Sequence, residues 1–208
     1  MSLLEYLVAL SLSLILVAPL IKNSGEFIAK QIELEKSHSL AAEADRALEL
    51  IGRAIRMAGY RNAQSLISFT RKEATLSDYI QVQKSNGYRG SDSLMVKHEI
   101  SQGMDFDCIG NTLSKERTKN QLAQQGFLVD RQSLIPKGMR VNGGSLVCQS
   151  LDRQGRLQNT TLMNGINHLS FELLAGSAGK VYRVKLEMTD GVSIHREFER
   201  TFATRNLL

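Results

Sequence analysis

The apolar N-terminal segment constrains the fold more than any other feature of this 208-residue chain. Residues 3 to 21, LLEYLVALSLSLILVAPLI, are interrupted only by Glu5, Pro19 and small residues. About twenty helical residues at ~1.5 Å each span ~30 Å, the thickness of a bilayer core. A cleaved secretory signal would carry a basic segment, a shorter apolar core and a small-residue cleavage site, none of which is present. We therefore predict a single transmembrane helix over residues 1–25.

The helical pattern continues beyond this span, over residues 26–59, which are rich in Ala, Glu, Leu and Lys. Five apolar residues recur four and three positions apart and mark one helix face: Ala44, Leu48, Ile51, Ile55 and Ala58. Gly59 follows them where a C-cap glycine would stand. Pro19 and Gly25 predict a kink near the segment Lys22–Gly25. We therefore expect one long helix with a membrane-spanning first half and an amphipathic second half.

The remaining residues, 60–208, show the alternating apolar pattern of β-strands. Turn-forming sequences such as SNGYRGSD, NGG and TDG separate the alternating stretches. The predicted strands cover residues 78–84, 92–99, 126–131, 145–151, 168–174, 180–188 and 193–205. The apolar stripe of the helix and the inner face of such a sheet each need a cover, and each can cover the other. We therefore predict an α+β fold, a long N-terminal helix packed on an antiparallel sheet of six or seven strands.

Residues with catalytic or metal-binding potential form no recognisable set. The four histidines, at positions 38, 98, 168 and 195, are far apart, and no nucleophile, phosphate-binding or dinucleotide-binding motif occurs. The segment Asp105–Glu116 places oxygen ligands at several EF-hand positions, but Ile109 stands where the fifth position needs an oxygen. We interpret this segment as an ordinary turn. We predict a protein that is not an enzyme and that holds no cofactor or metal.

Cys108 and Cys148 are the only cysteines in the chain. If residues 60–208 are exported across the membrane, both cysteines lie in an oxidising compartment, where two thiols usually pair. Closing a loop of about 40 residues stabilises a fold by about 4 kcal/mol in the chain-entropy model. We therefore predict a Cys108–Cys148 disulfide, and two reduced core cysteines remain the alternative.

The position of Glu5 in the apolar segment resembles a pattern of one protein superfamily. An apolar helix with a lone glutamate as its fifth residue resembles the mature N-terminus of type IV pilins and of type II secretion pseudopilins. In that superfamily a prepilin peptidase removes a short basic leader, and the new N-terminal residue is methylated. The resemblance therefore implies a pilin-like fold, with Met1 as the processed and methylated residue and Glu5 as the family's glutamate.

Six further segments, in the same order, resemble the landmarks of PilW-type minor pilins. They are AIRMAGYRNA (54–63), DSLMVKHE (92–99), DFDCIGN (105–111), LVCQS (146–150), LMNGINHLSFEL (162–173) and FATRNLL (202–208). The resemblance implies a structural subunit of a tip complex that primes assembly of a pilus used in adhesion, motility or DNA uptake. Its partners would be other minor pilins and the major pilin. The chain would span the bacterial inner membrane with its C-terminal domain in the periplasm, and would then enter the pilus on the cell surface.

The resemblance also gives Glu5 a role. A carboxylate inside hydrocarbon costs about 2–3 kcal/mol or more, so it should find a partner. The N-terminal ammonium of a neighbouring subunit would provide one, which makes Glu5 an assembly-docking residue. The alternative is a glutamate that extends toward the membrane interface.

Two other functions remain open. The first is a J-like pseudopilin of type II secretion, which shares the same architecture. The second is a tip subunit that binds DNA or a host surface directly, which the net charge of +5 permits. The candidate basic residues are Lys84, Arg89, Lys115, Arg117, Lys119 and Lys137. The lack of an aromatic stacking platform beside them argues against DNA as a direct ligand.

Overall fold

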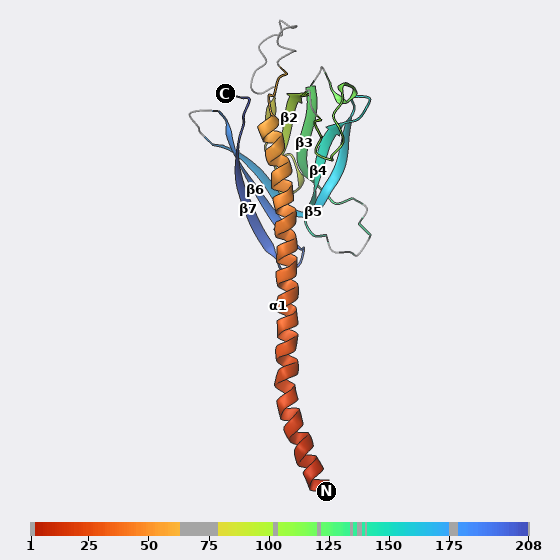
Figure 1. Cartoon of the computed structure of the whole chain (residues 1–208), viewed down its shortest axis with the longest axis vertical. Coiled ribbons are helices and arrows are strands. Elements are labelled where there is room, and N and C mark those ends of the chain that lie inside the picture. The colour runs from red at the N-terminus through yellow and green to blue at the C-terminus, as the bar shows by residue number, and fades with distance from the viewer. Residues whose placement is uncertain are drawn as a thin grey trace. The chain divides into compact units, whose positions relative to one another are not determined.

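Figure 1 presents a computed structural model of the chain, which divides into two compact units, Met1–Ser39 and Leu40–Leu208. The helix α1 (Leu3–Met57) contributes to both units. The structure describes residues 3–62, 79–101, 104–119, 122–133, 135–136, 139, 141–174 and 179–207. We assigned residues 26–39 to the amphipathic half of the helix, whereas the structure groups them with the N-terminal unit.

The part of α1 in the first unit is a continuous helix. It runs through Pro19 and Lys22–Gly25 without interruption, so the kink expected there does not divide the helix. A proline inside a helix removes one backbone hydrogen bond, and the bonds on either side persist. Figure 1 shows this red segment curving gently.

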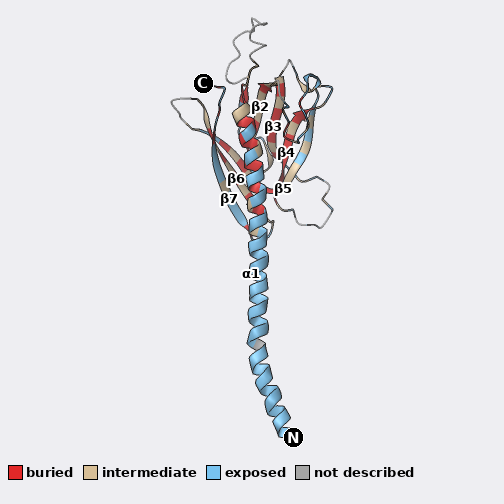
Figure 2. Ribbon diagram, viewed as in Figure 1, coloured by how far each residue is buried: buried red, intermediate tan, exposed pale blue. Residues whose placement is uncertain are grey.

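The part of α1 in the second unit packs against the sheet. All five residues of the predicted stripe are buried, with exposed fractions of 0 to 1%: Ala44, Leu48, Ile51, Ile55 and Ala58. Figure 2 shows these buried positions on the upper turns of α1. α1 ends at Met57, and Gly59 follows in the turn with a positive φ of 72°, which suits glycine. The Gly59 N–H donates to the carbonyl of Lys97 (3.1 Å), which ties the end of the helix to the sheet.

The sheet contains seven strands in sequential order, and every neighbouring pair is antiparallel. They are β1 (Ile80–Gln83), β2 (Ser93–Glu99), β3 (Leu122–Asp130), β4 (Gly144–Leu151), β5 (Leu157–Leu174), β6 (Val181–Thr189) and β7 (His195–Ala203). Short 3-10 helices occur at Tyr88–Gly90 (η2) and Lys115–Arg117 (η3). The predicted α+β class is confirmed, with a long N-terminal apolar helix and an antiparallel sheet.

Strand β5 is longer than predicted and changes partner halfway. We predicted a strand over residues 168–174, but β5 begins at Leu157. Its first half pairs with β4 as far as Ile166, and its second half pairs with β6 from Ile166 onward. Gly165 has a positive φ of 84°, and a register shift follows between Ile166 and His168. The two halves of β5 therefore leave different backbone edges without a neighbouring strand.

Candidate functional site

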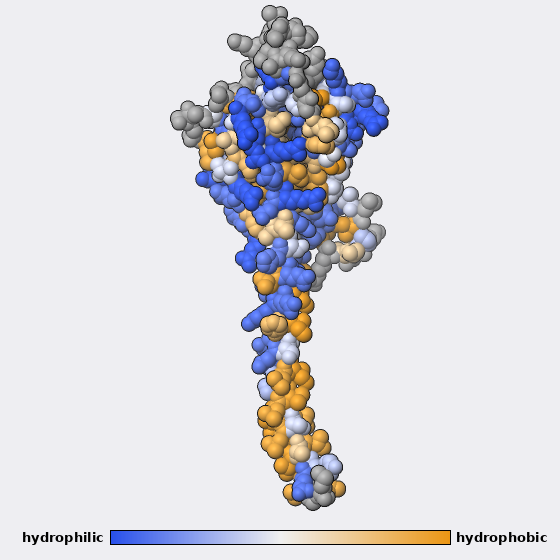
Figure 3. Space-filling view, in the orientation of Figure 1, coloured by the Kyte–Doolittle hydropathy of each residue, from blue (hydrophilic) through white to orange (hydrophobic). Residues whose placement is uncertain are grey.

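The most extensive unusual surface in the first unit is the apolar surface of α1. The large apolar side chains between Leu3 and Ile21 have exposed fractions of 45 to 80%. Figure 3 shows them as orange atoms around the lower helix. This helix is long and apolar enough to cross a membrane. Large exposed apolar surfaces mark contact with lipid or with other protein chains.

The apolar exposure extends past the span predicted from sequence. Four further apolar side chains have exposed fractions of 49 to 69%: Phe27, Ile28, Ile32 and Leu34. The helix from Leu3 to Leu34 is ~48 Å long at ~1.5 Å per residue, whereas a bilayer core is ~30 Å thick. A bilayer therefore cannot cover the whole apolar surface of this unit.

Glu5 lies in the first described turn of α1 and is exposed. A carboxylate in the first turn of a helix interacts favourably with the helix dipole. Met1, the predicted processing site, lies outside the described residues.

In the second unit, Cys108 and Cys148 are joined by a disulfide, with their Cα atoms 6.0 Å apart. Cys148 lies on β4, and Cys108 lies in the segment between β2 and β3. Both cysteines are buried, with exposed fractions of 5% or less. The bond therefore fastens a long connection to the centre of the sheet.

The residues of the EF-hand-like segment make local contacts. Asp107 is buried and accepts hydrogen bonds from the backbone N–H groups of Ile109 (3.0 Å) and Asn111 (2.8 Å). Asp105 accepts from the backbone N–H and the hydroxyl of Ser101 (2.6 and 2.8 Å). The bond from Ile109 to Asp107 is that of an Asx turn. Among the described residues, no group of three or more His, Cys, Asp or Glu could hold a metal ion.

His98 on β2 is buried, with an exposed fraction of 1%. Its Nδ1 donates to the carbonyl of Glu99 (2.9 Å), and its Nε2 accepts from Nε2 of Gln125 (3.3 Å). Gln125 also contacts the carbonyl of Phe106 (3.3 Å), so the network joins the sheet to the disulfide-linked segment. Burial lowers the pKa of His98, while the bond to Glu99 acts in the opposite direction. His98 is therefore a neutral residue of the core.

A polar brace covers one edge of β5, and sequence reasoning did not identify it. The N–H of Asp92 donates to the carbonyl of Leu169 (2.8 Å), and the Ser91 hydroxyl accepts from the N–H of Leu169 (3.2 Å). The Asp92 carboxylate accepts from the N–H of Phe171 (2.9 Å), and the Lys84 ammonium donates to the Phe171 carbonyl. The only local signal was a pair of polar residues, Ser91 and Asp92, directly before a strand.

The basic residues considered for DNA binding do not form an open cluster. Three of them contact polar groups within the domain: Lys84 with Asp92, Arg89 with Asn167, and Arg117 with Asp107. Lys137 lies outside the described residues. Lys115 and Lys119 are exposed.

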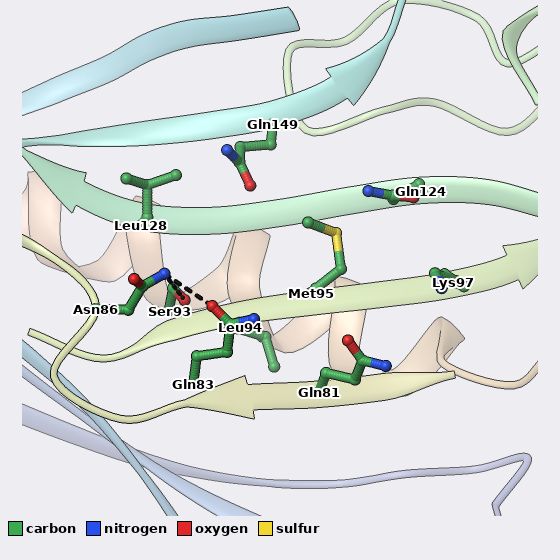
Figure 4. Close-up of a pocket in the computed structure, with 10 residues that line it drawn as sticks. All are labelled: Gln81, Gln83, Asn86, Ser93, Leu94, Met95, Lys97, Gln124, Leu128 and Gln149. Carbon is green, nitrogen blue, oxygen red and sulfur yellow. Dashed lines mark hydrogen bonds between the residues drawn. The ribbon is translucent and has the colours of Figure 1, made fainter. Parts of the chain in front are cut away.

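A shallow groove of about 270 Å³ lies on the sheet face opposite α1, as Figure 4 shows. Five carboxamides line it: Gln81, Gln83, Asn86, Gln124 and Gln149. Met95 and Gln149 of this lining pack closely over Gly126 of β3, where an added Cβ would lie 3.0 Å from Met95 and 2.9 Å from Gln149. The lining contains no carboxylate, histidine or cysteine, and Ser93 and Lys97 are its polar side chains other than carboxamides.

No protein-family model matches the chain, and no curated protein or solved structure is significantly similar to it. Function is therefore inferred from the residues and their geometry.

Proposed function

We propose that the chain is a PilW-type minor pilin, a structural subunit of a tip complex that primes assembly of a type IV pilus. One observation carries the proposal: α1 exposes apolar side chains over ~48 Å, more than the ~30 Å that a bilayer can cover. Phe27, Ile28, Ile32 and Leu34 form the part of this surface beyond the predicted span. Apolar helix surfaces outside lipid require other chains, and the stems of neighbouring pilins would provide them.

The two halves of α1 suit this role. The apolar half can remain in the membrane before assembly and pack against other apolar helices afterwards. The second half, with Ala44, Leu48 and Ile51 buried against the sheet, fastens the domain to the stem. Glu5 is the docking residue in this proposal, and it contacts the N-terminal ammonium of an adjacent subunit.

Replacing Glu5 by alanine tests the docking role. We expect Glu5→Ala to leave the protein in the membrane at normal abundance, but to reduce pilus number and recovery of other minor pilins by co-purification. Glu33→Ala is the matched control, because Glu33 is an exposed glutamate of the same helix beyond the predicted span. Normal piliation and co-purification in Glu5→Ala would exclude the docking role.

A second pair of variants tests the surface that carries the proposal. We expect Phe27→Ser and Ile32→Ser to weaken co-purification with the same partners while membrane insertion persists, since residues 3–21 are unchanged. The proteins that co-purify also discriminate the pilus subunit from a J-like pseudopilin, because their partners are pilus subunits in one case and secretion subunits in the other. Unchanged recovery of partners would show that lipid or detergent alone covers Phe27 and Ile32.

A further inference from the structure

The sheet has four backbone edges, and three of them are closed or protected. β1 is an edge strand of only four residues. The second half of β5 carries the brace formed by Ser91, Asp92 and Lys84. Short edge strands and covered edges are devices that prevent pairing with other chains.

The third protected edge is β7, which is rich in charge. Four of its nine residues are charged: Arg196, Glu197, Glu199 and Arg200. Glu197 and Glu199 form ion pairs with Lys185 (3.8 and 3.5 Å). An added strand would have to desolvate these charges, so β7 is a poor site for strand pairing.

The fourth edge, the first half of β5, has none of these protections in the part of the chain that the structure describes. Residues Leu157–Asn164, LQNTTLMN, contain no charged residue and no proline. They pair with β4 on one side, and the described residues provide no backbone partner on the other. Figure 1 shows this cyan segment at the outer border of the sheet. Because edge strands normally carry charge or a cover, an open neutral edge indicates a docking position.

The side chains of this half leave the open edge accessible. Gln158 donates to the Ser150 hydroxyl (3.1 Å), and Asn164 accepts from the Ser145 hydroxyl (2.7 Å). Both contacts are directed toward β4. Gln158 and Asn164 are therefore engaged on the paired side, while the described residues leave the backbone N–H and C=O groups of the other side for a partner chain.

A hollow of about 300 Å³ is lined by residues of β5, of β4 and of the β3–β4 connection. Thr161 and Asn164 of β5 line one part of it, and Ile135, Pro136 and Met139 of the β3–β4 connection line another. Met139 has an exposed fraction of 64%. Six of its nine lining residues are polar, and Ile135, Pro136 and Met139 form the apolar part that one side chain of a strand placed along β5 could contact.

We propose that the first half of β5 binds an extended segment of another protein chain by β-strand addition. The bound segment is an uncharged run of about eight residues, ~27 Å long, with an apolar side chain that enters the hollow. Backbone hydrogen bonds provide the affinity, and the hollow provides the selectivity. This docking edge does not depend on the pilin proposal, because it rests only on the sheet.

A defined peptide tests the proposal directly. The probe is a capped octapeptide that alternates threonine with valine and carries one leucine, added to the full-length chain in detergent micelles. The readout is hydrogen exchange of the backbone amides of Leu157–Asn164. We expect about half of these amides to slow, because alternate residues face the open edge. The same peptide with all of its amides N-methylated should give no protection, because the methyl groups prevent close approach of the two strands and the peptide cannot donate to the edge carbonyls.

Two variants at one position separate docking from folding. Thr161→Lys places a charge on the edge and fills the hollow, and it should weaken peptide binding about tenfold or more. Thr161→Val keeps the β-branched shape and should bind normally. Thr201→Lys on the protected β7 edge is the matched control and should not change binding. Slow exchange at β4 in every variant would establish that the sheet is intact.

Three results would overturn the proposal. The first is no protection at peptide concentrations up to about 1 mM. The second is equal protection by the N-methylated peptide or in Thr161→Lys, which would place binding elsewhere. The third is protection without peptide that rises with protein concentration, which would identify a second copy of this chain as the occupant.

Discussion

The Asp92 carboxylate has an exposed fraction of only 4% and accepts three hydrogen bonds. The donors are the N–H of Phe171 (2.9 Å), the N–H of Ser85 (3.1 Å) and the Lys84 ammonium (2.8 Å). Phe171 lies 79 residues from Asp92 in sequence. Loss of this carboxylate should therefore loosen a long-range contact between the start of β2 and the second half of β5.

The expected loss in the free energy of unfolding follows from the three hydrogen-bond donors. Without the carboxylate, the buried N–H of Phe171 lacks its acceptor, which costs about 1–3 kcal/mol. The Ser85 bond contributes about 1 kcal/mol. The Lys84 side chain is 64% exposed, so solvent reduces its contribution to less than about 1 kcal/mol. We expect Asp92→Ala to lower the free energy of unfolding by about 3 kcal/mol, and Asp92→Asn by about half as much, because the amide keeps an acceptor.

The destabilisation caused by Asp92→Ala should be smaller at low pH than at neutral pH. Burial raises the pKa of Asp92, but the hydrogen bonds from Lys84, Phe171 and Ser85 together hold it below the ordinary value of 3.8. A carboxyl with a lowered pKa in the folded chain stabilises the fold above its ordinary pKa. That stabilisation is lost as the pH falls through the lowered pKa. The difference between the wild type and Asp92→Ala should therefore narrow below pH 3.8.

Urea unfolding of the full-length chain in micelles, followed by the near-ultraviolet circular dichroism of its five tyrosines, measures the free energy. Hydrogen exchange at Leu169 and Phe171 reports on the braced edge itself. Asp152→Ala is the matched control, because its carboxylate accepts three hydrogen bonds within an exposed turn and should matter less. A loss below about 0.5 kcal/mol, or equal losses at about pH 3 and about pH 7, would refute the reasoning.

Three further predictions concern the core. Gly52→Ala should destabilise the domain by about 1–2 kcal/mol, because the added Cβ would overlap the Phe202 ring. This loss is expected although alanine favours helices. In urea unfolding, the double variant with Phe202→Leu should lose less free energy of unfolding than the sum of the two single losses. Replacing Cys108 and Cys148 by serine should cost about 3–4 kcal/mol, and unchanged thermal unfolding would contradict this. Burial lowers the pKa of His98 below 6.5, so the unfolded chain binds a proton more readily and stability should fall as the pH drops below 6.5. His98→Gln should remove this pH dependence, which urea titrations at several pH values would detect.

The strands could be predicted wherever one face is buried and the other is not. The predicted strand at residues 180–188 differs by only one position from β6, whose residues alternate between buried and half-buried. The first half of β5 escaped prediction because LQNTTLMN lies at an edge and is partly exposed on both faces. Its apolar residues therefore do not alternate, and only pairing with β4 defines it as a strand.

The candidate sites also differ in whether the sequence alone could reveal them. The apolar helix around Glu5 is a local pattern and can be read from the sequence. The Cys108–Cys148 disulfide could also be predicted, because the chain has only two cysteines. The brace at Asp92 could not be predicted from the sequence, because its hydrogen-bond donors and acceptors come from segments that are far apart in the chain. The sequence suggested Lys84 only as a candidate for contacts with DNA and did not reveal its ion pair with Asp92.

The sequence by itself determined the long helix, its apolar first half, the stripe from Ala44 to Ala58 and the antiparallel character of the sheet. These features depend on periodicity among residues that are close along the chain. The tertiary structure decided where β5 changes partner, which of its edges Asp92 closes and which edge stays open. Those outcomes depend on contacts between residues far apart in sequence, and no local pattern contains them.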